Sequence, residues 1–238
     1  MKAALLKIVE RQAAEFRQRI GLIGAEALNL KSLLLKLNVL AVYRPMSDKF
    51  SGMSLKSPAG ERFMLINSNQ PRCRQHFTIA HELYHLFIEE NPAPHNCEVE
   101  GGKNPVEQCA DAFAMMLLMP DSAVMQLMPE AELKAGTVSL GTVIKMEHYF
   151  SVSRRAMLNR LCDLGYISKS DRATLAAYPV VRSAREYGYD TALYQPGNEG
   201  LVIGDFGEKA RRLFDEGKIS EGHYRELLSK IGIYDYED

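Results

Sequence analysis

The stretch "FTIAHELYHLF", residues 77–87, decides how the rest of this sequence is interpreted. On a helix, His81 and His85 project from one face, one turn apart, because they are four residues apart. Two imidazoles so placed can bind one tetrahedral zinc ion, and Glu82 can act beside them as a general base without being a ligand. The alternative is a helix with two partly buried, hydrogen-bonded histidines. Apolar and small neighbours predict a buried setting, in which a metal ion is one way to satisfy these polar groups.

A catalytic zinc site needs a third protein ligand and keeps one position open. The segment "VEQCADAFAMMLLMP", residues 106–120, places Glu107 and Asp111 on one helix face, four residues apart. We predict Glu107 as the third ligand and Asp111 as the acceptor for the free N–H of a ligating histidine. The alternative is a solvated acidic edge near a helix N-terminus. Other candidates for the third ligand lie in the loop between the two helices: His95, Cys97, Glu98 and Glu100.

Composition indicates a folded protein with nearly balanced charge. The chain has 238 residues, which is enough for one sizeable core or two smaller ones, and 46% of them are hydrophobic. It carries 29 Lys and Arg against 30 Asp and Glu, so its net charge is −1. This balance gives no electrostatic reason for strong nucleic-acid binding, and no direct nucleic-acid binding is expected.

The cysteine content favours a reducing compartment. Cys73, Cys97, Cys109 and Cys162 lie far apart and form no CxxC pair. The first twenty residues lack the apolar run of a signal peptide. No window of 18 uncharged apolar residues occurs, which argues against a membrane span. These features predict a cytoplasmic protein.

The periodicity of apolar residues predicts an α+β fold. "VLAVY" at 39–43 is typical of a strand, and "MSLKS" and "ERFMLIN" flank the turn "PAG" as in a hairpin. We therefore expect a mainly helical domain with a small antiparallel sheet of about three strands. The predicted helices cover residues 2–20, 25–37, 71–90, 106–119, 121–128, 139–149, 153–164 and 169–177.

The C-terminal quarter has a different character. Residues 180–204 are typical of irregular chain with one or two short strands, and 206–230 predict two helices and a helical C-terminal tail. We therefore expect one domain over residues 1–178 and a small C-terminal segment over 179–238, with a regulatory or partner-binding role.

The motifs together resemble the ImmA/IrrE family of bacterial and phage-associated metallopeptidases. The resemblance is carried by "LINSNQP", "RQHFTIAHELYHL" and "EQCADAFAMMLLMP", and continues in "FSVSRRAMLNRLCDLGYIS". It covers roughly residues 20–170. The segment "LFDEGKISEGHYRELLSKIGI" is similar to a short helical tail of many members.

The resemblance implies a zincin-like metallopeptidase domain of the glutamate-ligand type. In it His81, His85 and Glu107 bind Zn2+, Glu82 is the catalytic base and Asp111 supports a histidine ligand. One residue departs from the family pattern, because Tyr84 stands where many members have glycine. A tyrosine there either narrows the cleft or only packs on it, so substrate access is in question, not the metal site.

The resemblance also implies an endopeptidase that cleaves a partner protein. The partner would be a helix-turn-helix repressor or an antitoxin encoded nearby, in stress, mobile-element or toxin–antitoxin settings. The alternative is a metal-bearing module that binds its partner, or the toxin of a toxin–antitoxin pair, with little proteolysis.

Two further features of the site are expected on chemical grounds. A separate donor should stabilise the oxyanion formed during peptide hydrolysis, and the candidates are His148, Tyr149 and Arg160. A peptide substrate is expected to bind in extended form along a sheet edge, for which we predict the strand at 51–56.

Overall fold

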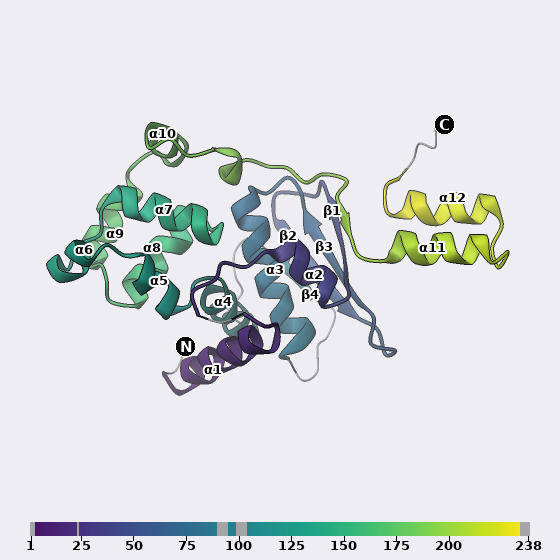
Figure 1. Ribbon diagram of the computed structural model, residues 1–238, viewed down its shortest axis with the longest axis horizontal. Helices are drawn as coiled ribbons and strands as arrows, with labels where there is room; N and C mark the ends of the chain where they lie inside the picture. Colours follow the sequence, from purple (N-terminus) through teal and green to yellow (C-terminus); the bar gives the residue numbers. More distant parts are fainter. Residues whose placement is uncertain (1–2, 23, 90–94, 99–103, 234–238) are drawn as a thin grey trace.

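The computed structural model of the chain describes residues 3–22, 24–89, 95–98 and 104–233 (Figure 1). Its elements are, in chain order, α1 (Ala3–Arg19), α2 (Leu30–Lys36), β1 (Val39–Arg44), β2 (Phe50–Lys56), β3 (Arg62–Asn67), α3 (Arg72–Phe87), β4 (His95–Glu98), α4 (Pro105–Leu118), α5 (Asp121–Leu127), α6 (Glu130–Ala135), α7 (Leu140–Phe150), α8 (Arg154–Asp163), α9 (Lys169–Ala176), α10 (Val180–Glu186), the 3₁₀-helix η1 (Ala192–Tyr194), β5 (Val202–Ile203), α11 (Phe206–Asp215) and α12 (Glu221–Lys230).

The strands form one mixed sheet in the order β4-β2-β3-β1-β5. As predicted, β2 and β3 pair as an antiparallel hairpin, but β1 runs parallel to β3, from Val39 opposite Arg62 to Arg44 opposite Asn67. The α+β class is confirmed. The expectation of about three antiparallel strands is wrong in strand number and in orientation, because it used only neighbouring segments and could not see the pairing of remote ones.

Strand β4 changes the role of β2. It pairs antiparallel with β2, from Ser54 opposite His95 to Phe50 opposite Glu98. The predicted edge at 51–56 is therefore wrong, since β2 lies between β3 and β4. Residues 95–98 sit in a stretch rich in proline and glycine and have no alternating pattern of their own, so only the pairing with β2 identifies them as a strand.

Several helices also differ from expectation. Helix α2 begins at Leu30, not at residue 25, because the Asn29 side chain caps it by accepting a 3.1 Å hydrogen bond from the Ser32 amide. Helices α6 and α10 were not predicted. Each follows a proline, Pro129 or Pro179, at its N-cap. These prolines precede a helix and do not end the structured chain.

Helix α3 lies at the centre of the domain, between the sheet and α4, and α1 packs against α4 (Figure 1). The Phe16 ring on α1 is 5.7 Å from both Phe87 on α3 and Phe113 on α4, measured between ring centroids. These aromatic contacts join the three helices around one core.

The segment after η1 returns to the sheet. Strand β5 pairs with β1, and the Gln195 carbonyl accepts from the Arg72 amide at 2.9 Å. The buried Gln75 side chain donates to the carbonyl oxygens of Ser68, Gln70 and Gly197 and accepts from Asn198. Residues 195–203 are therefore held against the start of α3 and the edge of the sheet.

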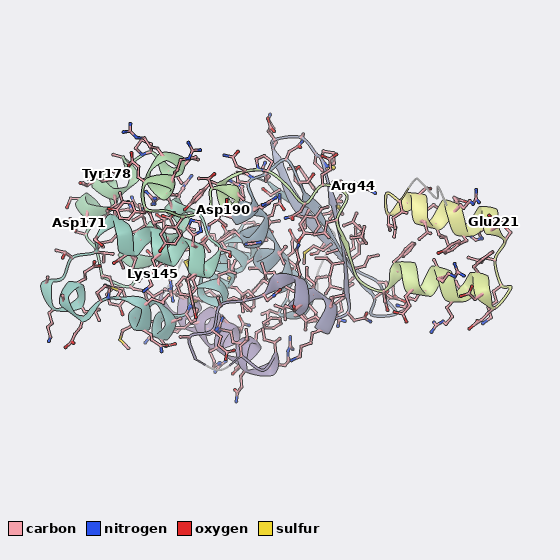
Figure 2. The ribbon with its side chains drawn as sticks, turned by 45° about the horizontal axis from the view of Figure 1, so that its top comes forward. Arg44, Lys145, Asp171, Tyr178, Asp190 and Glu221 are labelled. Carbon is pink, nitrogen blue, oxygen red and sulfur yellow. The ribbon has the colours of Figure 1, made fainter. Side chains whose placement is uncertain are left out.

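Helices α11 and α12 form a hairpin beyond the sheet, at the opposite end of the molecule from α5 to α9 (Figure 1). Phe214 and Tyr224 stack between them at 5.1 Å. Arg44, the last residue of β1, lies on the side of the sheet that faces the hairpin (Figure 2). Its guanidinium fills the space beside Gly232, where no Cβ would fit.

Replacing Gln75 by alanine should destabilise the chain by about 1–3 kcal/mol, because the buried Ser68 carbonyl and the half-buried Gln70 and Gly197 carbonyls lose a donor. Urea unfolding measures this change, and hydrogen exchange at the Gly197 amide, which donates to the Ser68 carbonyl at 3.2 Å, should become faster. The control Gln126→Ala, at an exposed position of α5, should change stability by less than about 0.5 kcal/mol. An unchanged exchange rate at Gly197 would contradict the assigned role of Gln75.

Stability should fall as the pH drops below about 6.5. Burial chiefly lowers the pKa of His76, against the opposing effect of its contact with the Ser151 carbonyl, and burial also lowers the pKa of His148. Since the unfolded chain takes up these protons first, unfolding is favoured between the ordinary histidine pKa and the lowered ones. In urea unfolding from pH 7.5 to 5, His76→Gln should flatten this dependence. The exposed His223→Gln should not, and equal slopes for both would contradict the argument.

Candidate metal centre

Helix α3 presents two buried histidines on one face. His81 is 2% exposed and His85 is 1% exposed, and their Nε2 atoms lie 3.2 Å apart. The i,i+4 spacing places both rings on the side of the helix that meets α4. Two ring nitrogens thus point at the same small volume.

Helix α4 brings a carboxylate to that volume. The Asn104 side chain caps the helix and Pro105 occupies its first turn, which places Glu107 in the same turn. Its Oε2 lies 3.2 Å from Nε2 of His81, and its Oε1 lies 3.7 Å from Nε2 of His85. Ligand atoms of these three residues lie within 4.8 Å of one another, and no other such His, Cys, Asp or Glu group occurs in the described part of the chain.

A carboxylate holds the outer nitrogen of each histidine. Nδ1 of His81 lies 2.9 Å from Oδ1 of Asp111, and Nδ1 of His85 lies 2.7 Å from Oε2 of Glu89. Because an ionised carboxylate only accepts, each Nδ1 donates, and each neutral ring then carries its lone pair on Nε2. Sequence reasoning missed Glu89, which lies just beyond the end of α3, although its i,i+4 spacing from His85 would have found it.

This donor set fits a divalent cation. Two lone pairs and one carboxylate converge, and acceptors that face one another repel unless a cation or a proton lies between them. Two nitrogens bound tetrahedrally at about 2.0–2.1 Å would be about 3.3 Å apart. The 3.2 Å between the two Nε2 atoms is close to this separation. Two histidines with one glutamate also match the ligand set of catalytic zinc sites.

Glu82 lies on α3 between the two histidines and is fully buried. Its Oε2 accepts a 2.6 Å hydrogen bond from Oγ of Ser54, a residue of β2 that is 4% exposed. Nothing in the local sequence pointed to Ser54, because the contact depends on how the sheet packs on the helix.

Tyr84 packs in the contact between α3 and α4. Its ring lies 5.6 Å from the ring of Phe113 and meets the ring of His85 edge-on at 5.6 Å. Burial chiefly, and then the neighbouring Cys109, raises the pKa of its hydroxyl to about 12. From the sequence, Tyr84 was expected either to narrow the cleft or only to pack on it. Its ring contacts with Phe113 and His85 are packing contacts.

The three predicted oxyanion donors lie elsewhere in the fold, and the structure does not describe the other predicted third ligands. Glu100 lies outside the described residues, as do the side chains of His95, Cys97 and Glu98 in β4. Tyr149 is 39% exposed, and its hydroxyl donates to the Ala25 carbonyl at 3.0 Å.

His148 is half-buried and belongs to a separate cluster. Its ring stacks on Tyr189 at 4.5 Å, and its Nε2 lies 3.2 Å from the Tyr194 hydroxyl. That hydroxyl donates at 2.5 Å to the fully buried Glu147, which also pairs with Arg154. No hydrogen bond or ring contact joins His148 to the two metal-candidate histidines or to Glu107 within the described residues.

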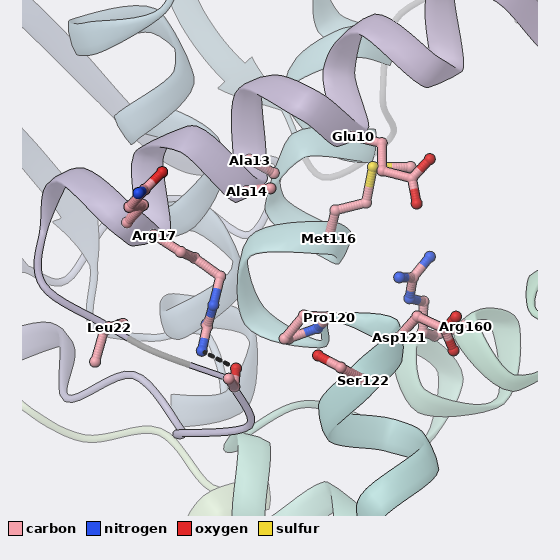
Figure 3. Close-up of a pocket in the computed structure, with 12 residues that line it drawn as sticks. Glu10, Ala13, Ala14, Arg17, Leu22, Met116, Pro120, Asp121, Ser122 and Arg160 are labelled. Carbon is pink, nitrogen blue, oxygen red and sulfur yellow. Dashed lines mark hydrogen bonds between the residues drawn. The ribbon is translucent and has the colours of Figure 1, made fainter.

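The Arg160 side chain comes from α8 and reaches the C-terminal end of α4, away from Glu107. Its Nε donates to the Met119 carbonyl at 2.8 Å, twelve residues beyond Glu107 and so about 18 Å along the helix axis. There it lines a pocket of about 320 Å³ with Arg17 and Glu10 of α1 and Asp121 of α5 (Figure 3). Burial lowers the pKa of Arg160.

The comparisons with known proteins give one family. The model of the family Peptidase_M78, described as the IrrE N-terminal-like domain, matches residues 35–162, just over half of the chain. The match includes α3 and α4, and therefore every residue of the candidate metal group. No curated protein gives a significant match.

We expect the chain to bind one divalent ion and to lose it in His81→Ala and in Glu107→Ala, because each variant removes a ligand. Glu89→Gln should lower the affinity for the ion by about 10–100-fold, because His85 loses the carboxylate that orients it. Competition with a chromophoric chelator measures these affinities. The exposed Glu186→Gln serves as the control and should bind as the wild type does. Wild-type affinity in Glu89→Gln would refute the role given to Glu89.

Proposed function

Since the chain belongs to the family of IrrE N-terminal-like peptidases, we propose that it is a zinc-dependent endopeptidase that hydrolyses a peptide bond in a partner protein. The family match confirms the resemblance found in the sequence motifs, and with it a metallopeptidase type of function and a protein as substrate. Zinc, cleavage within a chain and the identity of the partner are parts of the proposal.

One observation carries the proposal: two buried Nε2 atoms and the Glu107 carboxylate converge, while Asp111 and Glu89 hold both Nδ1 atoms. Imidazole nitrogens combined with one carboxylate suit zinc better than magnesium or calcium, which prefer oxygen ligands alone. Three protein ligands leave one position for a reactant, which a purely structural zinc site would fill.

When bound, the ion supplies a Lewis acid that polarises a peptide carbonyl and lowers the pKa of a water molecule. Glu82 takes the proton of the attacking water as a carbon–oxygen bond forms. The same carboxyl delivers that proton to the leaving nitrogen as the carbon–nitrogen bond breaks. Asp111 and Glu89 keep the two imidazoles in the tautomer that presents Nε2 to the site.

The proposed substrate is a DNA-binding regulator, either a helix-turn-helix repressor or an antitoxin, and the proposed compartment is the cytoplasm. The family resemblance and the low number of cysteines, which form no CxxC pair in the sequence, support these choices. In the described part of the chain, no helix combines the length and the apolar composition that crossing a membrane requires.

The C-terminal segment is proposed to bind the partner. The α11–α12 hairpin stands apart from the candidate site at one end of the molecule, which leaves its outer faces accessible (Figure 1). Under this proposal residues 1–178 carry out the hydrolysis, and the C-terminal segment binds the partner.

Cleavage by the zinc-loaded chain can be followed by mass spectrometry on the regulator encoded beside it. The wild type should cleave, and Glu82→Gln should lose at least about 100-fold in rate while keeping one zinc per chain, because only the base is removed. Glu186→Gln, an exposed carboxylate changed in the same way, should cleave normally.

The two ways in which this experiment can go against the proposal have different meanings. Cleavage retained in Glu82→Gln would show that another residue is the base. A zinc-loaded wild type that binds its regulator but leaves it intact would favour the binding module over the peptidase.

A further inference from the structure

Two contacts between strand β2 and helix α3 lie close to the candidate site. At the first, Gly52 lies against Thr78, so closely that a Cβ at Gly52 would be 2.5 Å from Thr78 Cγ2 and 3.0 Å from the Leu65 carbonyl oxygen. At the second, the Ser54 hydroxyl donates to the Glu82 carboxylate at 2.6 Å. Both contacts are buried.

The spacing of the two contacts matches in the strand and in the helix. Gly52 and Ser54 are two residues apart on one face of β2, about 6.6–6.8 Å along the strand. Thr78 and Glu82 are four residues apart on one face of α3, about 6 Å along the helix. Strand and helix therefore run side by side in the same direction, and the close Gly52–Thr78 contact brings Ser54 to Glu82.

We propose that Ser54 is a positioning residue for Glu82, an inference that rests on the proposed function of the site. Its hydroxyl fixes one carboxylate oxygen and so selects one rotamer of a side chain that has three rotatable bonds. At 4% exposure, Ser54 is shielded from water that would compete for this bond. A base held in one orientation loses less entropy when it takes a proton from the attacking water.

The same strand offers a matched control. Ser51 is also buried, at 3% exposure, but its Oγ makes no hydrogen bond within the described residues. It lies where the register between β2 and β4 shifts, between Phe50 and Gly52, and it makes no hydrogen bond to Glu82. Changing Ser51 to alanine therefore removes the same atom from the same strand without touching Glu82.

The first test is a double-mutant cycle on stability, measured by urea unfolding of the full chain with saturating zinc. Ser54→Ala and Glu82→Ala should be coupled by about tenfold or more in the unfolding equilibrium constant, about 1.4 kcal/mol. The reason is that either substitution alone already removes the hydrogen bond to the carboxylate, so the double variant loses less stability than the sum of the two single variants. Ser51→Ala and Glu82→Ala should show no coupling. Equal coupling in the two cycles would overturn the inference.

The second test separates positioning from a structural role, using cleavage of the neighbouring regulator. Ser54→Ala should lower kcat by about 10–100-fold while KM and zinc content stay within about twofold, and Ser54→Thr, which keeps the hydroxyl, should restore most of kcat. Ser51→Ala should cleave as the wild type does. A kcat within twofold of wild type in Ser54→Ala would overturn the positioning role.

Failure of the proposed function gives a different result. A wild type that cleaves nothing removes the proposed function, and the positioning role with it. The stability cycle would still report the bond, because it needs no substrate.

Discussion

The domain depends on the burial of α3, a helix that carries polar groups on a largely enclosed surface. His81, Glu82 and His85 are each at most 2% exposed, and polar groups so buried need partners. The partners come from three directions: α4 supplies Glu107 and Asp111, the chain just after α3 supplies Glu89, and β2 supplies Ser54. The apolar core sets how α4 and β2 approach α3, while these contacts fix the register of that approach.

How much the sequence could predict depends on how far apart along the chain the interacting residues lie. The spacing of His81 and His85, and of Glu107 and Asp111, is a property of single helices, so the sequence pointed to both pairs and the structure brings them together. The α+β class was likewise readable from local periodicity. The strand order, the parallel pairing of β1 with β3 and the existence of β4 depend on contacts between remote segments. The same limit hid Ser54.

The three oxyanion candidates show how a reactive residue type can be used for packing. Arg160 donates to the Met119 carbonyl, one of the orphan acceptors at the C-terminal end of α4, and Tyr149 donates to the Ala25 carbonyl. His148 joins the cluster around Glu147 that links α7 to η1. Position after the metal helices in sequence made these residues candidates, but the faces of α7 and α8 that meet the core are set by tertiary packing.

The position of β2 links orientation of the base to access of the substrate. One hydrogen-bonding edge of β2 is taken by β3 and the other by β4, while the face with Gly52 and Ser54 rests on α3. An extended peptide can add to β2 between Phe50 and Ser54 only by displacing β4, since strand addition needs unpaired backbone groups. With β4 in place, peptide pairing at this end of the sheet is confined to the outer edge of β4. Strand β4 therefore separates β2 from the substrate backbone. A peptide that pairs with the outer edge of β4 leaves the contact between Ser54 and Glu82 in place.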